Sequence, residues 1–480
     1  MRLSALVRRE VDPDPEVTGV TADSRLVKPG YLFAALPGTN TDGRRFIDDA
    51  LRAGAVAVLA GEAIPGLAAP VVRACDPRRA YALAAAAFWG AQPQTCVAVT
   101  GTNGKTSVVA FCRQIFESLG RKSASMGTLG VQAGSDQITP PGLTSPDAGD
   151  VARLLADLAR RGVTHLALEA SSHGIDQRRL DGVRLTAAAF TNLSQDHLDY
   201  HGDMARYRAA KLRLFQALLP RGATAVLNAD ARDFAAFEAA ATGAGQTVFS
   251  VGEKGRDLHL AAREALPGGQ RLAVEATGAR VELNLPLAGA FQASNALVAA
   301  GLCIAAGEDQ ARVLAALEHL QGAAGRMQRI GTGPRGGEAF VDYAHTPDGL
   351  RAMLEALRPH TRGRLIVAFG AGGDRDRAKR PLMGAAAAET ADVVIITDDN
   401  PRTEEPAAIR RAILAAAPGA REIGDRRAAI RTAVALLGGG DVLVVAGKGH
   451  ELDQIVGATV LPFDDAAEVA AALRGEAEHG

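Results

Sequence analysis

The chain has 480 residues, 47% of them hydrophobic, which is enough apolar surface for about three globular domains. Its 53 Lys and Arg residues balance its 54 Asp and Glu residues, and the resulting net charge of -1 argues against a general nucleic-acid or acidic-membrane binder. Because the sequence has no Cys-x-x-Cys pair, no signal peptide and no apolar run of about 18 residues, we expect a cytoplasmic protein without structural zinc, disulfides or membrane spans.

The first 90 residues contain short apolar runs broken by Gly and Pro, at 31–36 and 55–60. They predict a small α/β domain that ends in a helix over 77–89, and the Gly-Ala-Gln-Pro stretch at 90–93 is typical of a linker. Residues 91–328 then alternate apolar runs with amphipathic helices such as 148–160. The apolar runs lie at 96–99, 166–168, 187–190 and 225–227. This alternation predicts a mostly parallel sheet with helices on both faces.

Residues 329–480 repeat the alternation, with strand-like runs at 365–369, 393–396 and 442–445. A polar loop containing Gly or Pro follows each run directly. Ligands of open parallel sheets bind at the carboxyl ends of the strands, so we expect the three loops to face one site. The loop at 370–375 begins like a dinucleotide fingerprint, but Arg375 replaces its last Gly, so we predict no NAD site.

A phosphate-binding loop is the strongest local signal. It joins the 96–99 run to a helix expected from about Ser107 to Leu119, and we predict that it binds ATP through Gly101, Thr102, Asn103, Gly104, Lys105, Thr106 and Ser107. In such a loop the lysine reaches the outer phosphates and the threonine holds Mg²⁺. Val99 replaces the first Gly of the strict motif, so this is a shorter Gly-x-x-Gly-Lys-Thr loop. The alternative is a glycine turn without a ligand.

Polar side chains at the ends of two further strands favour a divalent-metal site. Glu169 follows the 166–168 run, where an enzyme with a phosphate loop needs a second Mg²⁺ ligand. His197 and His201 follow the next run, and Lys211 comes ten residues later. The two histidines have the i, i+4 spacing of zinc proteases, but the Glu of His-Glu-x-x-His is missing, so we reject that interpretation. A polar loop with a hydrogen-bonded core histidine stays open as an alternative.

The ordered motifs of the chain are similar to those of the Mur ligase family over nearly its whole length. They include Asp23-Ser-Arg25, the phosphate loop, Glu169-Ala-Ser-Ser-His173, 192–199, Tyr207-Arg-Ala-Ala-Lys211, Gly325-Arg-Met327, 342–347, 372–376, Asp399-Asn-Pro-Arg402 and Gly447-Lys-Gly-His-Glu451. The resemblance implies an α/β protein with a uridine-binding domain (1–90), a central ATPase domain (91–328) and a C-terminal Rossmann-like domain that binds an amino acid (329–480). We expect a monomer.

Within the family the chain most resembles the members that add the third residue of the stem peptide. This implies three substrates, which are ATP, UDP-N-acetylmuramoyl-L-alanyl-D-glutamate and a diamino acid. Lys211 matches a lysine that is carbamylated in the family, and it would hold Mg²⁺ together with Thr106, Glu169 and His197. The implied catalytic residues are Lys105, Glu169, His197 and Lys211.

The resemblance also implies the remaining contacts. The UDP-sugar peptide would contact Ser24, Thr39, Asn40, Thr41, Thr144, Ser145, Ser171, Gln177 and Arg179. Asn295, Arg326, Asp342 and His345 fall in segments that close over ATP. Leu143, Ser145 and Gln292 depart from residues common in the family, which puts individual contacts in doubt.

The third substrate follows from charge. Meso-diaminopimelate carries a carboxylate and an ammonium at its distal end, whereas lysine carries only the ammonium. Arg402 can grip that carboxylate with two parallel hydrogen bonds, and lysine-adding relatives lack this Arg. The expected acceptor residues are Arg375, Asp399, Asn400, Pro401, Arg402, Gly447 and Glu451. The alternatives are a solvated Arg402, a lysine-adding Mur ligase, a folylpolyglutamate synthetase-like ligase and a non-catalytic ATP-binding regulator.

Overall fold

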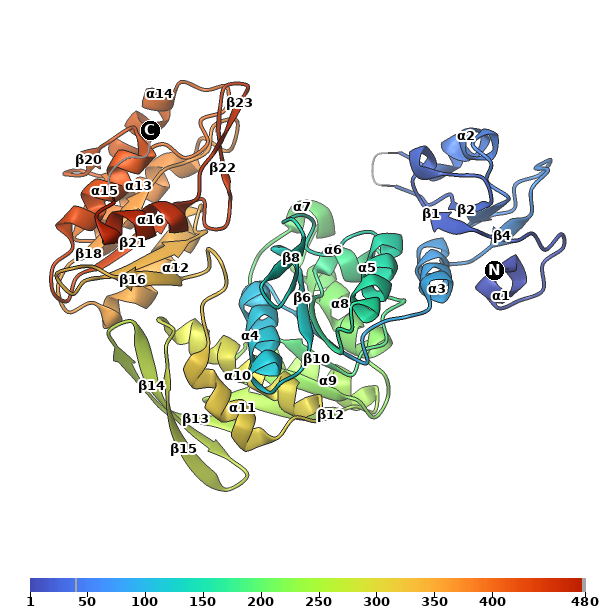
Figure 1. Cartoon of the computed structure of the whole chain (residues 1–480), viewed down its shortest axis with the longest axis horizontal. Coiled ribbons are helices and arrows are strands. Elements are labelled where there is room, and N and C mark those ends of the chain that lie inside the picture. Colours follow the sequence, from blue (N-terminus) through green and yellow to red (C-terminus); the bar gives the residue numbers. More distant parts are fainter. Residues whose placement is uncertain (39–40, 477–480) are drawn as a thin grey trace. The chain divides into compact units, whose positions relative to one another are not determined.

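A computed structural model describes residues 1–38 and 41–476 (Figure 1). The fold is α/β, as predicted. The chain divides into two compact units, unit 1 (Met1–Val251 and Val298–Asp309) and unit 2 (Gly252–Leu297 and Gln310–Gly480). The domain boundaries predicted at 90 and 328 stay a prediction, because these units divide the chain at other places. No helix in the described part of the chain is long and apolar enough to cross a bilayer.

The N-terminal part of unit 1 is a parallel four-stranded sheet with helices on both faces (Figure 1). Successive residues of a strand point to opposite faces, so Leu32 packs with helices α1 and α3 whereas Phe33 packs with α2. Helix α3 has the predicted bounds, and Asp76 caps it by accepting a hydrogen bond from the backbone N–H of Arg79 at 3.0 Å. The elements are α1 (Leu3–Val7), β1 (Gly19–Thr21), β2 (Tyr31–Ala34), α2 (Ile47–Arg52), β3 (Ala57–Ala60), β4 (Val71–Arg73) and α3 (Pro77–Trp89).

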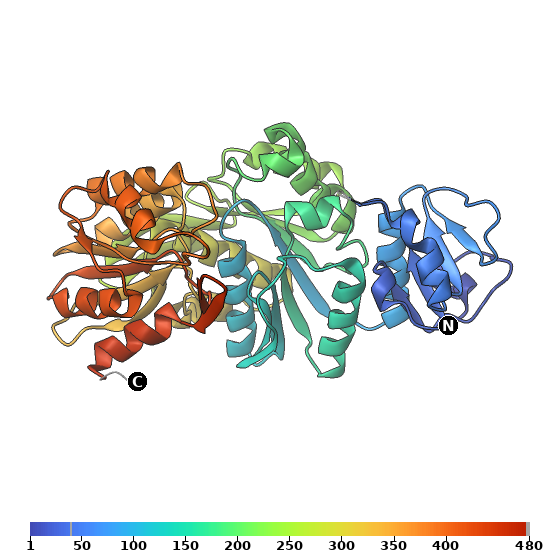
Figure 2. The same ribbon diagram turned by 90° about the horizontal axis from the view of Figure 1, so that it is seen from above.

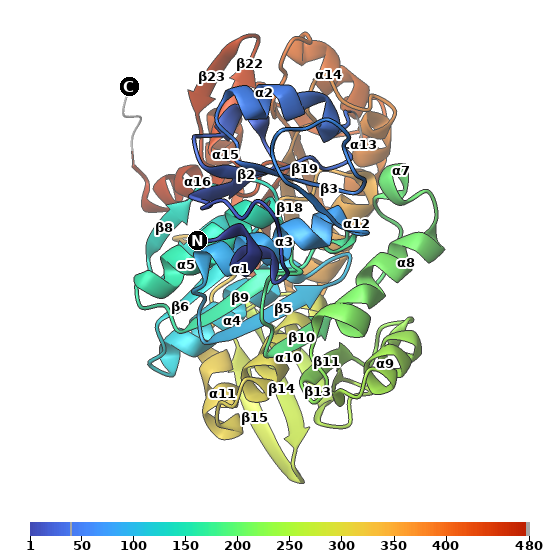
Figure 3. The same cartoon turned by 90° about the vertical axis from the view of Figure 1, so that its right-hand side faces the viewer.

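The second sheet of unit 1 runs in the order β12-β11-β10-β5-β9-β6-β7-β8. Strands β12 to β6 of this order are parallel, and β7 and β8 are antiparallel additions at one edge. Strand β5 lies between β9 and β10 (Figure 3), and all three are buried on both faces, which explains their continuous apolar runs. The carboxyl ends of these three strands therefore meet at one edge of the sheet.

The elements of this part come in chain order. They are β5 (Thr95–Thr100), α4 (Lys105–Ser118), β6 (Ser123–Gly127), β7 (Gly130–Ala133), β8 (Asp136–Thr139), α5 (Ala148–Arg160), β9 (His165–Glu169), α6 (Ser172–Asp176), β10 (Ala187–Phe190), α7 (Leu198–His201), α8 (Met204–Arg213), β11 (Thr224–Asn228), α9 (Phe234–Gly243) and β12 (Thr247–Gly252).

An antiparallel three-stranded meander, β13 (Leu258–Leu266), β14 (Gly269–Ala276) and β15 (Ala279–Leu285), opens unit 2 and was not predicted. Strands β14 and β15 are joined by the two-residue turn Thr277-Gly278, in which both residues have positive φ (49° and 79°). That is the geometry of a tight hairpin turn, but Thr-Gly is a weaker sequence signal for it than Asn-Gly. Helices α10 (Ala290–Ala305) and α11 (Gln310–Ala316) follow.

The sheet of unit 2 has the order β16-β17-β21-β18-β19-β20, with helices packed on both faces (Figure 2). Strands β17, β21, β18 and β19 are parallel, so their carboxyl ends are adjacent. The fully buried pair of Arg426 and Asp465 ties the last helix, α16, to α15, with Nε and Oδ1 2.7 Å apart. Arg426 also donates a hydrogen bond to the carbonyl oxygen of Ala446 in β21 at 3.0 Å.

The elements of this part begin with β16 (Gln328–Thr332), β17 (Glu338–Asp342), α12 (Pro347–Leu357), β18 (Leu365–Phe369), α13 (Lys379–Thr390), β19 (Val393–Ile396) and α14 (Pro406–Leu414). They continue with β20 (Arg421–Glu422), α15 (Arg426–Leu436), β21 (Val442–Ala446), β22 (Asp453–Val456), β23 (Thr459–Pro462) and α16 (Asp465–Arg474).

Candidate active site

The predicted phosphate loop connects β5 to α4, which begins at Lys105, two residues before the expected start. Gly101 and Gly104 have φ of 153° and 89°, and a Cβ on Gly101 would lie 1.9 Å from Oγ1 of Thr191. These positions therefore require glycine. The Lys105 ammonium donates hydrogen bonds to the carbonyl oxygens of Gly101 and Thr102, both at 2.8 Å, so it lies over the loop.

The segment after β10 holds this loop in place. The carbonyl oxygen of Asn192 accepts a hydrogen bond from the N–H of Thr102 at 2.9 Å, and its side-chain oxygen accepts one from the N–H of Asn103 at 3.0 Å. The hydroxyl of Thr102 lies 3.1 Å from that of Tyr207. Asn192 and Tyr207 are absent from the predicted site residues, and their only sequence signal was membership of a family motif.

Lys211, on α8, is 1% exposed and lies against the phosphate loop. Its ammonium donates a hydrogen bond to the carbonyl oxygen of Gly101 at 2.7 Å and lies 4.5 Å from the ring centre of Tyr207. Burial and then the positive charge of Lys105 hold the pKa of Lys211 well below its usual range. The site therefore favours the neutral amine.

Glu169 is the last residue of β9 and is 2% exposed. It pairs with Val99 of β5, just before the phosphate loop. Its two carboxylate oxygens accept hydrogen bonds from the N–H and the hydroxyl of Thr128 at 2.9 and 3.3 Å. A Cβ on Gly127 would lie 2.1 Å from Oε1 of Glu169, so glycine there makes room for the carboxylate. The structure thus places a fixed carboxylate at the strand end predicted from the sequence.

His197 lies half-exposed at the start of α7, with its ring centre 4.9 Å from that of His173. His201, four residues on, is buried. Across residues 1–38 and 41–476, no three His, Cys, Asp or Glu side chains are gathered closely enough to hold a metal ion. Of the four predicted Mg²⁺ ligands, only Glu169 and His197 are residues of these four types, so the predicted ligand set stays a prediction. The Thr106 hydroxyl and the Glu169 carboxylate offer oxygen atoms, which Mg²⁺ prefers as ligands.

Five residues predicted to bind the muramoyl dipeptide lie in one network. The guanidinium of Arg179 donates hydrogen bonds to the carbonyl oxygen of Ser145 at 2.6 Å and to the amide oxygen of Gln177 at 2.7 Å. The hydroxyls of Ser145 and Ser171 are 3.0 Å apart. Thr144 joins through the hydroxyl of Thr128, also at 3.0 Å. Burial lowers the pKa of Arg179, so its poorly solvated charge would be stabilised by an anionic ligand.

The predicted uridine contacts are less completely described. Ser24 is partly buried and begins a short 3-10 turn after β1. Thr41 is exposed, and its carbonyl oxygen accepts a hydrogen bond from the N–H of Gly38 at 3.0 Å. Thr39 and Asn40 lie outside the described residues. The uridine contacts therefore stay predictions.

The four residues expected to close over ATP lie in unit 2, where a chain of contacts joins three of them. Asn295 donates a hydrogen bond to the amide oxygen of Gln292 at 3.1 Å, and Gln292 donates one to the carbonyl oxygen of Arg326 at 3.2 Å. Gln292 departs from the family pattern, yet it bridges two predicted residues. Asp342 accepts a hydrogen bond from the N–H of Met327 at 2.7 Å, and burial raises the pKa of its carboxyl group.

Three side chains lie around the ring of Tyr343, the residue that follows Asp342. The guanidinium of Arg326 lies 4.8 Å from the ring centre of Tyr343, and the ring of His345 lies 4.6 Å away. The ring of His450 is 5.0 Å away. The predicted residues Arg326, Asp342 and His345 therefore surround the end of β17.

A cavity of about 460 Å³ opens at the carboxyl ends of β17, β18, β19 and β21. Three loops meet there, as predicted. Six of the seven expected acceptor residues line it, namely Arg375, Asp399, Asn400, Arg402, Gly447 and Glu451. Lys379 also lines it and was missed by the sequence analysis, because it lies at the first residue of α13 and outside the quoted motifs. Its ammonium donates a hydrogen bond to the carbonyl oxygen of His345 at 2.9 Å, and burial lowers its pKa. The cavity thus offers both positive and negative charges.

Arg402 is held in an unusual backbone conformation, with φ of 50°. Its N–H donates a hydrogen bond to the carbonyl oxygen of Ile455 at 3.0 Å, and its guanidinium donates one to that of Gly373 at 2.8 Å. A Cβ on Gly372 would lie 2.9 Å from the guanidinium, and a Cβ on Gly447 would lie 2.7 Å from a carboxylate oxygen of Asp399. The glycines of the neighbouring loops therefore make room for the charged groups.

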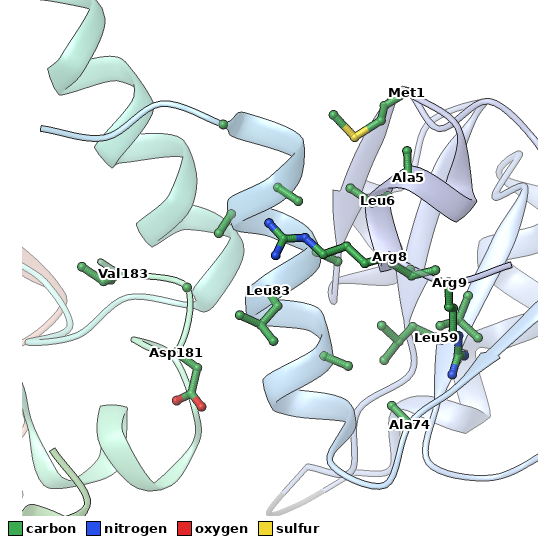
Figure 4. A pocket seen from close by; sticks show the side chains of 18 of the residues that line it. Met1, Ala5, Leu6, Arg8, Arg9, Leu59, Ala74, Leu83, Asp181 and Val183 are labelled. Atoms are coloured by element: carbon green, nitrogen blue, oxygen red, sulfur yellow. The ribbon is translucent and has the colours of Figure 1, made fainter. Parts of the chain in front are cut away.

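A larger cavity, of about 800 Å³, lies in unit 1 between α1, α3 and the loop 181–184 (Figure 4). Leu83 and Val183 contribute apolar surface, and Arg8 and Arg9 contribute charge. The carboxylate of Asp181 is already paired with Arg213, at 2.6 and 2.8 Å. Among the residues that the structure describes, no predicted site residue lines this cavity, so cavity size alone does not identify the active site.

The sequence matches three models of one family in order along the chain. These are "Mur ligase family, catalytic domain" over residues 16–88, "Mur ligase middle domain" over 99–303 and "Mur ligase, glutamate ligase domain" over 325–449. A relative from Caulobacter vibrioides, named UDP-N-acetylmuramoyl-L-alanyl-D-glutamate–2,6-diaminopimelate ligase, is 69% identical over 99% of both chains. The chain belongs to the Mur ligase family. The three-domain architecture expected from the resemblance is confirmed.

Solved structures of Mur ligases and their relatives share the fold. A structure of a UDP-N-acetylmuramoyl-L-alanyl-D-glutamate–2,6-diaminopimelate ligase is 34% identical with a TM-score of 0.78, covering 99% of both chains. The folylpolyglutamate synthase of Mycobacterium tuberculosis is 21% identical with a TM-score of 0.61 and covers 83% of this chain and 95% of its own. At that identity it shows only the shared Mur ligase fold.

Proposed function

We propose that the chain is an ATP-dependent ligase that adds meso-diaminopimelate to the γ-carboxylate of the D-glutamyl residue in UDP-N-acetylmuramoyl-L-alanyl-D-glutamate. The reaction belongs to the synthesis of peptidoglycan precursors. The observation that carries the proposal is the acceptor cavity of unit 2, lined by Arg402 and Arg375 as well as Asp399 and Glu451. Because the reaction consumes ATP, we propose the cytoplasm as its compartment.

The charges of the cavity match the proposed amino acid better than lysine. Diaminopimelate has two carboxylates and two ammonium groups, so a cavity with cations and carboxylates can pair both kinds of group. A guanidinium can bind a carboxylate through two parallel hydrogen bonds, which an ammonium on the substrate cannot replace. A lysine substrate would leave Arg402 without its anion inside a partly enclosed site.

In the first step the D-glutamyl carboxylate attacks the γ-phosphorus of ATP. An acyl phosphate forms, and ADP leaves with the electrons of the broken bond. Lys105 would stabilise the negative charge on the transferred phosphoryl group, and the backbone N–H groups of the loop and the N-terminus of α4 would hold the phosphates. Half-buried Arg179 and its hydrogen-bonded neighbours would position the muramoyl dipeptide.

Lys211 would take part as a carbamate. A neutral amine can attack carbon dioxide to form an N–C bond, and loss of one proton to water leaves a carbamate with one negative charge. The buried environment of Lys211 favours the neutral amine that this addition needs. Carbamylated Lys211 would then hold Mg²⁺ with Thr106, Glu169 and His197, and the bound ion would neutralise phosphate charge.

In the second step the amine of diaminopimelate attacks the acyl phosphate carbonyl and forms an amide bond, the C–O bond to phosphate breaks, and the amine loses one proton, so that the products are the amide and hydrogen phosphate. The attacking amine must be neutral. Asp399 and Glu451 would bind ammonium groups of the acceptor, and Arg402 its distal carboxylate, so that the reacting amine is held near the carbonyl.

Phosphate release measured with ATP, the UDP-muramoyl dipeptide and one amino acid at a time tests the proposal. We expect release with meso-diaminopimelate and little with L-lysine or L-glutamate. Release with L-lysine alone would identify a lysine-adding ligase, and release with a folate and glutamate would identify a folylpolyglutamate synthetase-like enzyme. No release with any acceptor would favour a non-catalytic ATP-binding protein.

A further inference from the structure

Lys448, in the loop after β21, is fully buried although it is a lysine. Its ammonium donates hydrogen bonds to the side-chain oxygen of Asn400 at 3.1 Å and to a carboxylate oxygen of Glu451 at 3.3 Å. It also donates one to the carbonyl oxygen of Asp453. An ammonium has three donors. Two of these acceptors, Glu451 and Asp453, belong to the segment of Lys448 itself, and the third, Asn400, belongs to the loop after β19. Lys448 therefore ties its own loop to the loop after β19 behind the acceptor cavity.

The two side chains that Lys448 contacts also contact each other. The amide nitrogen of Asn400 donates a hydrogen bond to the same Glu451 oxygen at 2.8 Å. Both residues line the acceptor cavity, whereas Lys448 does not belong to its lining. Glu451 thus has one carboxylate oxygen fixed from the protein side by an amide and an ammonium, while its side chain stays 36% exposed.

The same group of contacts extends to Arg402 through the hairpin of β22 and β23 (Figure 1). The side-chain oxygen of Asn400 accepts a hydrogen bond from the N–H of Ile455 at 2.9 Å. The carbonyl oxygen of Ile455 accepts one from the N–H of Arg402, and the N–H of Gly457 donates one to the carbonyl oxygen of Arg402 at 2.7 Å. The hairpin therefore holds the backbone on both sides of Arg402. Lys448 in turn binds Asp453, the first residue of the hairpin.

We infer that Lys448 is a positioning residue for the acceptor amino acid. This inference rests on the proposed function. The buried ammonium fixes Asn400 and Glu451, where the substrate's ammonium binds, and, through the hairpin, Arg402, where its distal carboxylate binds. Lys448 thereby sets the distance between the negative subsite at Glu451 and the positive subsite at Arg402, although Lys448 itself touches no substrate.

Steady-state kinetics of Lys448→Met test this inference. Methionine has a similar length and no donor, so the three acceptor oxygens each lose the bond to Lys448 and the loops can separate. We expect the KM for diaminopimelate to rise by about 10- to 100-fold, the range expected when binding groups move by about 1 Å. The KM values for ATP and the UDP-muramoyl dipeptide should stay within about twofold.

A second measurement separates positioning from stability. Leu354→Ala creates a cavity in the core of unit 2 at a residue that does not line the acceptor cavity, and it should lower Tm while leaving the KM for diaminopimelate unchanged. If Lys448 acts through Asn400, Lys448→Met should add little to the loss in kcat/KM already caused by Asn400→Ala. Equal losses in both backgrounds, or a lowered Tm with an unchanged KM for diaminopimelate, would overturn the inference.

The test distinguishes failure of this inference from failure of the proposed function. If wild-type protein does not use diaminopimelate, the proposed function fails. If wild-type protein uses it and Lys448→Met does so with the same KM, only the role of Lys448 is wrong. Should Lys448→Met not fold, Lys448→Gln keeps the test open, because an amide retains fewer donors than the ammonium and must also raise the KM for diaminopimelate. An unchanged KM in Lys448→Gln would then contradict the inference.

Discussion

The Lys211 ammonium donates a hydrogen bond to the carbonyl oxygen of Gly101, 2.7 Å away, inside the phosphate loop of the same unit. A second cation, Lys105, donates to the same carbonyl oxygen at 2.8 Å. Two lysine side chains thus share one acceptor, and burial together with the Lys105 charge lowers the pKa of Lys211 and favours its neutral form. Conversion of Lys211 to a carbamate would place a negative charge beside the positive charge of Lys105.

Lys211→Ala should lose nearly all ligase activity, because the variant lacks the amine that forms the carbamate. Short carboxylic acids such as formate or acetate should restore part of the activity by supplying a carboxylate in the space left by the side chain. The exposed lysine Lys122, replaced by Ala, serves as the control and should keep wild-type turnover. Full activity of Lys211→Ala without added acid would contradict the proposed role.

Lys105→Ala should abolish ATP turnover while the UDP-muramoyl dipeptide still binds. Lys105 lies over the phosphate loop, whereas the predicted dipeptide residues form their own network around Arg179 and Ser145. Isothermal titration calorimetry with each ligand measures both halves of the prediction. Loss of dipeptide binding in a folded variant would mean that the two sites are not separate.

Stability between pH 6.5 and 4 should depend on His450. Burial and then the charge of Arg326 lower the pKa of His450 to about 4. In the unfolded chain the imidazole has a pKa of about 6.5, so between these values the unfolded state binds more protons and stability falls as pH falls. The contribution of His450 to the free energy of unfolding that is lost over this range is at most about 3 kcal/mol. The actual loss is smaller because the ring is partly exposed to solvent.

His450→Phe keeps a ring beside Tyr343 but removes the titration. The difference in unfolding free energy between wild type and variant, measured by urea denaturation at pH 7 and at pH 4.5, should shift in favour of the variant at the lower pH. Carboxylates titrate in both proteins, so their effect cancels in this difference. The same difference at both pH values would show that His450 is not held neutral.

Much of the fold could be predicted because the buried strands are continuous apolar runs. The helices 77–89 and 148–160 and the strands 187–190, 365–369 and 393–396 have the predicted bounds. The antiparallel meander β13 to β15 was missed, since its outer strands carry exposed polar residues and its tight turn is Thr-Gly rather than Asn-Gly. The start of α4 was placed two residues late, because Gly104 rather than a Ser or Asp side chain precedes it.

The site residues were predicted largely through family motifs and not through local chemistry. Gly-Lys-Thr and a carboxylate at a strand end carry their own physical reasons, and the structure places Lys105 and Glu169 accordingly. The predicted role of Lys211 came from the family resemblance alone, and its burial in the structure explains why that position favours a neutral amine. Lys379 and Lys448 became visible only when the loops were brought together, because their roles depend on contacts between segments distant in sequence.

The most direct test of the account is kcat/KM of Arg402→Ala with meso-diaminopimelate and with L-lysine. Two hydrogen bonds to a charged group contribute about 1.5–3 kcal/mol each, so losing them should lower kcat/KM for diaminopimelate by about two to four orders of magnitude. L-lysine has no distal carboxylate, and its poor use should hardly change. Arg377→Ala, which removes an exposed arginine paired with Glu404, is the matched control and should behave as wild type. A selective loss with diaminopimelate is the predicted result, and equal losses with both amino acids would contradict the assignment of Arg402 and of the substrate.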